Sequence, residues 1–204
     1  MLTTTEIFAL TLVLSLPLGF VFCFMRMSKN KALSTVMKVY ISIMRGTPLM
    51  LQLMVVFFAP SLLFGLTLSW QGWRFTAVIV GFVFNYAAYF AEIFRAGMES
   101  ISPGQYEAAN ILGFSKGQTF FKIILPQVIK RVLPPVTNET ITLVKDTSLA
   151  FVLSVMEMFT EAKQIVATTS SIAPFIVAAV FYFVFNAIVA AVMGKIEKKL
   201  SYYN

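Results

Sequence analysis

The polar residues with the clearest chemical potential lie in an otherwise apolar segment, residues 136–153. Asn138, Thr142 and Asp146 recur there at intervals of four residues, a spacing that places side chains on one face of a helix. Ionisable groups inside a membrane span are costly, and they often mark substrate or ion pathways. Such a row could donate hydrogen bonds to a carboxylate and accept them from an ammonium group. The alternative is that Asp146 and its neighbour Lys145 serve folding, by pairing locally or by reaching the membrane surface.

Other polar residues are weaker candidates for a transport path. Gln52 and Asn186 could line such a path, but hydrogen bonds between helices explain both equally well. Glu157 and Glu161 are spaced to share a helical face, where they could line an outward-facing vestibule and suit a cationic ligand. A solvated outer face is the alternative for these two carboxylates, and the nearby Lys163 weakens the case for a cation.

The composition is that of a protein embedded in a bilayer. Of its 204 residues, 58% are hydrophobic and only 12% are charged, about half the charge of a soluble domain. The sequence has no histidine and a single cysteine, Cys23, which removes Ser-His and Cys-His nucleophile pairs and the usual zinc sites. It also has no G-x-x-x-x-G-K-[ST] phosphate loop. We therefore expect an all-α polytopic membrane protein that is not an enzyme, with no catalytic residues, no metal and no cofactor of its own.

Five segments are apolar and long enough to cross about 30 Å of hydrocarbon. The first is expected to be retained, because it lacks the basic start of a signal peptide and its apolar stretch is too long. The fourth is the least apolar of the five. The sequence thus predicts one transmembrane domain over residues 1–204, with spans at 6–25, 48–68, 75–93, 136–153 and 172–193.

The distribution of Lys and Arg orients these spans. Both residue types gather in the loop before the second span, in the long loop before the fourth, and in the C-terminal tail. Since cytoplasmic loops carry this excess, the N-terminus is expected outside and the C-terminus in the cytoplasm. The same topology explains the net charge of +7 without nucleic-acid binding, because no basic stripe lies on a soluble domain.

Two further groups of residues are expected to have structural roles. Trp70 and Trp73 lie in the short outer loop, where indole rings anchor at the membrane interface. Glu92 and Arg95 are spaced for an ion pair along one helix, and we expect Arg45 to join them near the cytoplasmic face.

The long polar loop, residues 102–127, carries two helix-start signals. Ser102 is expected to cap a helix, with Gln105 reaching back to it, and Ser115 with Gln118 forms a second capping box. The loop should therefore contain two helices and stand outside the bilayer as a rigid element.

The first of these helices, over about 103–112, is expected to end at Gly113, which supplies a left-handed residue. The second should run toward Pro126. The first helix would present a small, partly apolar contact face to a partner, formed by Tyr106, Ala108, Ala109 and Leu112.

This loop resembles the coupling (EAA) loop of the permease subunits of type I ABC importers. The matching residues are Glu107-Ala108-Ala109, Gly113 and the ending Ile123-Ile124-Leu125-Pro126. The resemblance covers nearly the whole chain and is closest to the polar amino-acid branch, of histidine, arginine and glutamine type. The stretches that carry it outside the loop are Arg45-Gly46-Thr47-Pro48, residues 91–97 followed by Gly104-Gln105, Asn138-Glu139-Thr140, and residues 145–149.

The resemblance implies a five-helix permease of the bacterial cytoplasmic membrane that imports polar L-amino acids, basic ones among them, by alternating access. It implies a second permease subunit, either a copy or a paralogue, and two cytoplasmic ABC ATPase subunits that bind ATP and Mg. An extracytoplasmic amino-acid-binding protein would deliver the substrate. The residues implied to engage the ATPase are Tyr106, Glu107, Ala108, Ala109, Leu112 and Gly113.

Three other functions remain open at this point. A gradient-driven carrier could use a five-helix unit, although it would have no ATPase for the loop of residues 102–127 to bind. A membrane enzyme is disfavoured by the missing nucleophile and metal residues. A non-transporting sensor subunit could borrow the same fold.

Overall fold

The computed structural model describes residues 1–66, 68 and 72–200, so the predicted interfacial Trp70 lies outside the described residues. Within these ranges every regular element is a helix, as the all-α prediction requires. In lipid, helices satisfy all their own backbone hydrogen bonds, which explains why apolar segments of this length adopt them. The elements are α1 (Leu2–Arg26), α2 (Lys31–Gly46), α3 (Leu49–Phe64), α4 (Trp73–Glu99), α5 (Pro103–Ile111), α6 (Lys116–Gln118), η1 (Thr119–Ile124), α7 (Leu125–Asp146), η2 (Thr147–Leu153), α8 (Met158–Thr169) and α9 (Ala173–Leu200).

Three of the described helices, α1, α4 and α9, are individually long and apolar enough to cross a membrane. The pair α2 and α3 passes the same test only when taken together, with a bend of 114° between them. The predicted fourth span, residues 136–153, falls across the end of α7 and the 3-10 helix η2. Helix α7 is long enough at 22 residues but too polar to count as a span by composition, and η2 has only seven residues.

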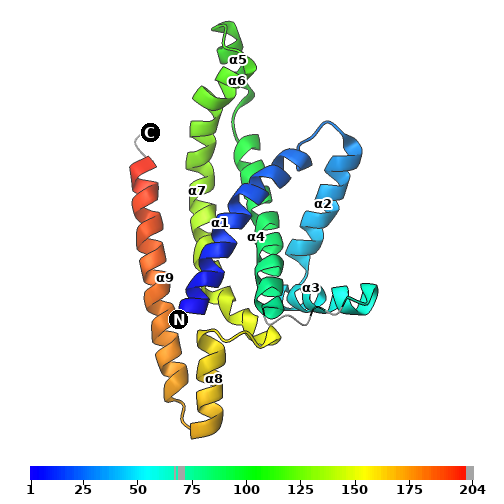
Figure 1. The fold of residues 1–204 in the computed structure, drawn as a ribbon. Coiled ribbons are helices and arrows are strands. Elements are labelled where there is room, and N and C mark those ends of the chain that lie inside the picture. Colours follow the sequence, from blue (N-terminus) through cyan, green and yellow to red (C-terminus); the bar gives the residue numbers. More distant parts are fainter. Residues whose placement is uncertain (67, 69–71, 201–204) are drawn as a thin grey trace.

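The predicted second span, residues 48–68, corresponds to α3 and differs from the expected continuous crossing. Thr47 is extended before Pro48, as a residue preceding proline prefers, and this breaks the chain between α2 and α3. Figure 1 shows α2 lying alongside the bundle while α3 runs across it. Lys38 and Arg45, expected in a loop, therefore lie on helix α2.

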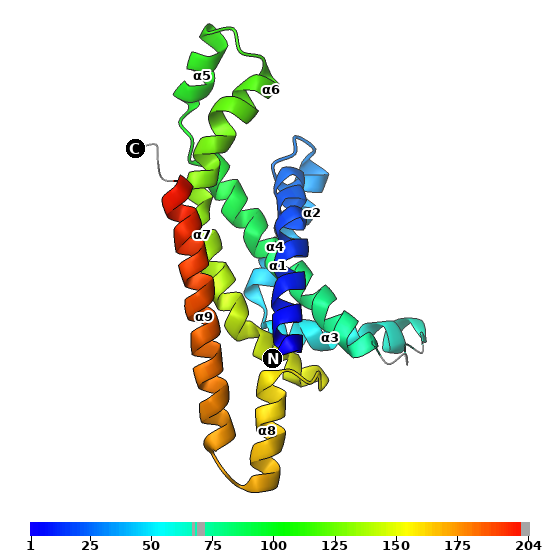
Figure 2. The same cartoon turned by 60° about the vertical axis from the view of Figure 1, so that its left-hand side comes forward.

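The bundle has two distinct ends. Figures 1 and 2 show α5 and α6 projecting beyond the other helices, at the end where α9 finishes and α1 passes into α2. The hairpin of α8 and α9 extends from the opposite end. The three regions rich in Lys and Arg thus share one end, as the charge pattern predicts.

Helix α1 packs along α4 through a row of small side chains. Its buried residues recur every three or four positions, which makes one continuous face. At Gly19 the helices approach so closely that a Cβ would lie 2.7 Å from the Phe90 Cβ and 3.0 Å from the Ala87 carbonyl oxygen. Small residues allow this approach, the usual basis of helix contacts in membranes. The row is Thr4, Ile7, Thr11, Ser15, Gly19 and Cys23.

Two glycines of α4 bring other helices equally close. A Cβ at Gly81 would lie 2.6 Å from Leu53 Cδ2 on α3, and a Cβ at Gly97 would overlap Val132 Cγ1 on α7. Helix α4 is thus the common packing partner of α1, α3 and α7.

The second helix of the polar loop does not end near Pro126 but continues into α7. Pro126 lies in the first turn of α7, where a missing N–H costs least. The chain reaches it through six residues of π-helix, η1, which widen the turn just before the proline. The loop and α7 therefore form one connected helical element, interrupted only in its hydrogen-bond pattern.

We predict that Gly97→Ala destabilises the contact between α4 and α7. The added methyl group overlaps Val132, and overpacking a tight contact costs about 1–3 kcal/mol of unfolding free energy. Thermal unfolding of the detergent-purified protein measures this. Adding Val132→Ala should restore part of the loss, and Gly194→Ala, with no atom near its Cβ, is the control. Equal stability of Gly97→Ala and Gly194→Ala would contradict the contact.

Candidate functional site

The projecting loop begins with a capped helix. The Ser102 Oγ accepts a hydrogen bond from the Gly104 N–H at 3.3 Å, which confirms the predicted cap of α5. The expected return contact from Gln105 is not formed; its Oε1 instead accepts from Gln127 Nε2 at 3.3 Å. Gln105 thereby joins the start of α5 to α7.

The corner after α5 depends on Gly113. Its φ is +75°, in the left-handed region, and a Cβ there would meet nothing within 4 Å. Backbone conformation rather than space therefore requires glycine. The Phe114 N–H reaches back to the Ala109 carbonyl at 3.0 Å and the Gly113 N–H to the Asn110 carbonyl at 3.0 Å, which closes the helix end.

The second start signal forms as predicted. The Ser115 Oγ accepts from the Gln118 N–H at 3.3 Å, and the Gln118 Oε1 accepts from the Ser115 N–H at 2.9 Å. This reciprocal capping box fixes the direction in which the chain leaves the Gly113 corner.

The accessible face of α5 differs in part from the predicted one. Ala109 is only 1% exposed, so it packs toward its own chain and is not available to a partner. Glu107 and Ala108 are exposed, and Tyr106 and Leu112 are 44% and 73% exposed. Ile111, which the sequence analysis did not select, is 85% exposed. Exposed apolar side chains on a polar projecting loop indicate a contact surface.

Helix α7 is hydrogen-bonded both to the end of α4 and to the start of α5. On the α4 side, the Arg131 guanidinium on α7 donates to the Ser100 carbonyl. On the α7 side, Gln127 Nε2 contacts Gln105 and also donates to the Ile123 carbonyl at 2.9 Å. A displacement of α5 would therefore be transmitted to both α4 and α7.

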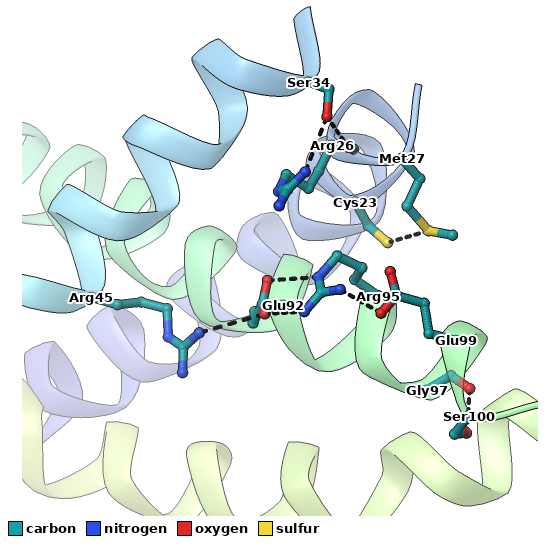
Figure 3. Close-up of polar contacts among 10 residues, drawn as sticks. All are labelled: Cys23, Arg26, Met27, Ser34, Arg45, Glu92, Arg95, Gly97, Glu99 and Ser100. Carbon is teal, nitrogen blue, oxygen red and sulfur yellow. Dashed lines mark hydrogen bonds and ion pairs between the residues drawn. The ribbon is translucent and has the colours of Figure 1, made fainter. Parts of the chain in front are cut away.

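A charged network occupies α4 just before this loop. Figure 3 shows Glu92 between Arg95 on its own helix and Arg45 on α2. The Glu92 carboxylate accepts from Arg95 at 3.0 and 2.5 Å, and Arg95 also contacts Glu99 at 2.5 Å. Arg45 lies farther from Glu92, at 4.0 Å, and over the Tyr89 ring at 5.5 Å. The predicted ion pair and the approach of Arg45 are both present.

A cavity of about 410 Å³ lies between α2, α4 and α7 and includes this network. Its walls contain cations and carboxylates together with one aromatic ring. Such a lining complements a small molecule that carries both an ammonium and a carboxylate. The lining residues are Arg45, Tyr89, Glu92, Ile93, Ala96, Gly97, Ser100, Arg131, Pro135 and Glu139.

The predicted polar row on α7 is only partly placed near this cavity. Asn138 is exposed and Thr142 half-buried, and neither lines the cavity, whereas the adjacent Glu139 does. Asp146 accepts a 2.7 Å hydrogen bond from the hydroxyl of Tyr86, a side chain that is 2% exposed. Both Tyr86 and Glu139 were missed, and Glu139 could have been chosen as an ionisable residue in a predicted span.

Gln52 has the interhelical role that the sequence analysis kept as an alternative. Its Nε2 donates to the carbonyls of Met44 and Thr47 at 3.0 and 3.1 Å, across the break between α2 and α3. Its Oε1 accepts from Asn85 of α4 at 2.9 Å. This amide pair holds the bent helices against α4. Asn186 differs, because its buried Oδ1 has no hydrogen-bond partner in the described part of the chain.

Glu157 does not line an outward-facing vestibule, as the sequence had suggested. It is fully buried and precedes α8 as its N-cap, accepting from the N–H groups of Phe159 and Thr160 at 2.8 and 2.7 Å. The hydroxyl of Tyr182 on α9 also donates to it at 2.8 Å. Glu161, one turn later, is exposed. The two carboxylates therefore do not form one accessible face.

Residues 15–202 match the family model described as binding-protein-dependent transport system inner membrane component. The chain belongs to this family. Its permease relatives include the L-cystine transport system permease protein TcyB of Bacillus subtilis (strain 168), 35% identical over 98% of this chain and 84% of its own length. The arginine transport system permease protein ArtQ of the same organism is 34% identical over 97% of this chain and 89% of its own.

Solved structures place the permease in the same fold. A chain in the crystal structure of an amino acid ABC transporter with histidines superposes with a TM-score of 0.87 at 30% identity, covering 98% of this chain and 91% of that one. An inward-facing structure of the MetNI methionine ABC transporter gives a TM-score of 0.71 at 18% identity, over 98% and 91% of the two chains, a likeness of fold alone. The predicted resemblance to type I ABC importer permeases is thereby confirmed.

In the described part of this permease, no group of three His, Cys, Asp or Glu side chains lies close enough together to hold a metal ion.

We predict that Gly113→Ala loosens the corner after α5. A non-glycine residue in the left-handed region costs about 1 kcal/mol, so the amides of Phe114 and Ser115 should exchange with solvent roughly fivefold faster. Hydrogen exchange with mass spectrometry of the purified permease measures this. Gly117→Ala is the control, because its Cβ also meets nothing within 4 Å and its φ is not positive. Identical exchange in both variants would contradict the role of the Gly113 conformation.

Proposed function

We propose that this chain is the membrane-spanning subunit of an ATP-driven importer of polar L-amino acids. The observation that carries the proposal is the projecting, capped helix α5, which exposes Ile111 and Leu112 at its end and is hydrogen-bonded to α7 through Gln105. Helix α7 is bonded in turn to the end of α4 through Arg131 and Ser100. Membership in the inner-membrane permease family and relatives named for cystine, arginine and glutamine transport support it.

In this proposal α5 binds a groove on a cytoplasmic ABC ATPase, and two such subunits serve a dimer of permeases. ATP and Mg bind on the ATPase. Binding of ATP favours one arrangement of the complex over the other, since a ligand that binds two states equally shifts neither. An extracytoplasmic binding protein delivers the substrate to the outward-open arrangement. The contacts of Gln105 and Arg131 support transmission of the movement from α5 into the bundle.

The two ends of the bundle support a proposed membrane arrangement. The crossings would be α1, the bent pair α2 and α3, α4, α7 with η2, and α9. The basic ends of α2, α7 and α9 would face the cytoplasm with α5, and the N-terminus would lie outside. In this proposal the chain is a multi-pass protein of the bacterial cytoplasmic membrane.

The cavity beside α4 is the proposed substrate path. An amino acid carries an ammonium and a carboxylate, and the cavity offers Glu139 for the first and Arg131 or Arg45 for the second. Asp146, held by Tyr86, and the half-buried Thr142 lie farther along α7 toward η2, where they extend a polar path. Asn138 stays an exposed candidate at its margin, whereas Glu161, exposed on α8, lies outside the proposed path.

The proposal predicts that Leu112→Asp separates the permease from its ATPase. The substitution places a charge in a buried interface, so recovery of the ATPase with the tagged permease from native membranes should fall about tenfold or more. The matched control is Ile165→Asp, an exposed apolar residue on α8 at the other end of the bundle. Equal recovery from both variants would overturn the docking role of α5. Absence of any ATPase with the unaltered chain would favour a carrier or a sensor subunit.

The substrate path is tested by neutralising one carboxylate. Glu139→Gln removes the negative charge that would bind the substrate ammonium group and should lower uptake of labelled amino acids by proteoliposomes about tenfold, the usual loss for a contact with a charged group. Uptake of cystine, arginine and glutamine would be compared at equal ATPase content. Glu161→Gln, an exposed carboxylate on α8, should have little effect. If Glu161→Gln lowered uptake more than Glu139→Gln, the substrate path would not pass through the cavity.

A further inference from the structure

A second cavity lies on the other side of the Arg45–Glu92 pair. Its volume is about 350 Å³, and both residues of the pair line it as well as the first cavity. Three cations line it against one carboxylate, so its formal lining charge is positive. The lining residues are Arg26, Lys38, Ile41, Ser42, Arg45, Gly46 and Glu92.

The cations of this cavity are held by the fold rather than scattered on the surface. Lys38, Ser42 and Arg45 are spaced four and three residues apart, so they form one stripe on α2. Arg26, at the end of α1, forms the facing wall, and Figure 3 shows its guanidinium turned to Ser34. That contact is 3.0 Å, and the Ser34 hydroxyl donates in turn to the Arg26 carbonyl at 2.7 Å. The turn between α1 and α2 thus fixes one cation in place.

The single carboxylate leaves the positive charge largely uncompensated. Both oxygens of Glu92 are already bound by Arg95, at 3.0 and 2.5 Å, whereas Arg45 is 4.0 Å away. Within residues 1–66, 68 and 72–200, no carboxylate lies within 4.0 Å of the charged nitrogens of Arg26 or Lys38. Three cations converging on a cavity with one occupied acceptor favour an anionic guest.

The surroundings decide which kind of anion fits. An exposed apolar stripe lies on α2, on the face next to the stripe of Lys38, Ser42 and Arg45. It consists of Val36, Val39 and Ile43, spaced three and four residues apart and exposed by 64%, 52% and 52%. Free phosphate or a nucleotide gains nothing from an exposed apolar helix face. An amphiphile with an anionic head and hydrocarbon tails uses both features.

We propose that this cavity binds the phosphate headgroup of an acidic phospholipid, with the acyl chains along the apolar face of α2. Basic pockets beside membrane helices recognise such headgroups, and the long Lys38 stem lets its ammonium reach a phosphate near the membrane surface. A bound phosphate would also compete with Glu92 for Arg45. Lipid binding would thereby act on the wall that the two cavities share.

The test is lipid binding to the membrane-extracted protein, together with the subunits that accompany it. After delipidation, native mass spectrometry follows titration with phosphatidylglycerol, phosphatidylcholine and glycerol phosphate. We expect phosphatidylglycerol to bind preferentially. Lys38→Gln should weaken it about fivefold and Lys38→Gln with Arg26→Gln about 25-fold, since each cation near an anionic surface contributes roughly this much. Lys38→Arg should keep the binding.

Lys31→Gln is the control, because Lys31 is an exposed cation on the same helix that does not line the cavity. Equal effects of Lys31→Gln and Lys38→Gln would overturn the proposal, as would equal binding of phosphatidylcholine. Binding of glycerol phosphate as strong as that of phosphatidylglycerol would assign the cavity to free phosphates instead. Arg26→Gln removes the bond to Ser34 and can impair folding, so Lys38→Gln alone keeps the test decisive.

Discussion

The close approach of three helices to α4 is the constraint on which the rest of the structure depends. Gly19, Gly81 and Gly97 leave no room for a Cβ against Phe90, Leu53 and Val132 respectively. In lipid, such packing must replace the hydrophobic force that drives helices together in water. Because α4 is held this tightly, its polar residues have fixed positions. From α4, Glu92 reaches α2, Asn85 reaches both α2 and α3, and Tyr86 reaches α7. The cavities lie between the same helices.

Local signals in the sequence predicted the parts of the molecule that local forces determine. Gly113 and the Ser115–Gln118 box need only a few neighbouring residues, and both formed as expected. The start of the second span at Pro48 was predicted, but the helix α2 before it and the sharp bend between α2 and α3 were missed, because hydropathy does not report direction. Glu157 was misplaced for another reason. Its burial depends on Tyr182, 25 residues later, and no spacing rule connects a cap with a side chain on another helix.

In the candidate site, too, local contacts were predictable and long-range contacts were not. The Glu92–Arg95 pair lies within one helix and was predictable, whereas Asn85 with Gln52 and Tyr86 with Asp146 join residues 33 and 60 positions apart. The predicted polar row lies on the correct helix, α7, but Asn138 and Thr142 do not lie on the face that lines the cavity. Glu139, rather than Asn138, lines the cavity, because its own neighbours Pro135 and Arg131 share that face with it. Helical periodicity identifies a face, but only packing shows which face meets α4.

The ion pairs of α4 and the helix α5 form one continuous connection. Glu92, Arg95 and Glu99 follow α4 to its end, where the Ser100 carbonyl accepts from Arg131 of α7. Helix α5 begins three residues later and is bonded back to α7 through Gln105 and Gln127. A movement of α5 therefore reaches α4 and α7 together, and the cavity lies between these two helices.

Arg45 is the most weakly held residue of the charged network, 4.0 Å from Glu92, and it lines both cavities. A small shift of α7 against α4 changes the surroundings of Glu92 without breaking its bond to Arg95. Arg45, whose contact with Glu92 is the longest, can move with α7 during such a shift. Because Arg45 lines both cavities, its movement changes the shape and the charge of both.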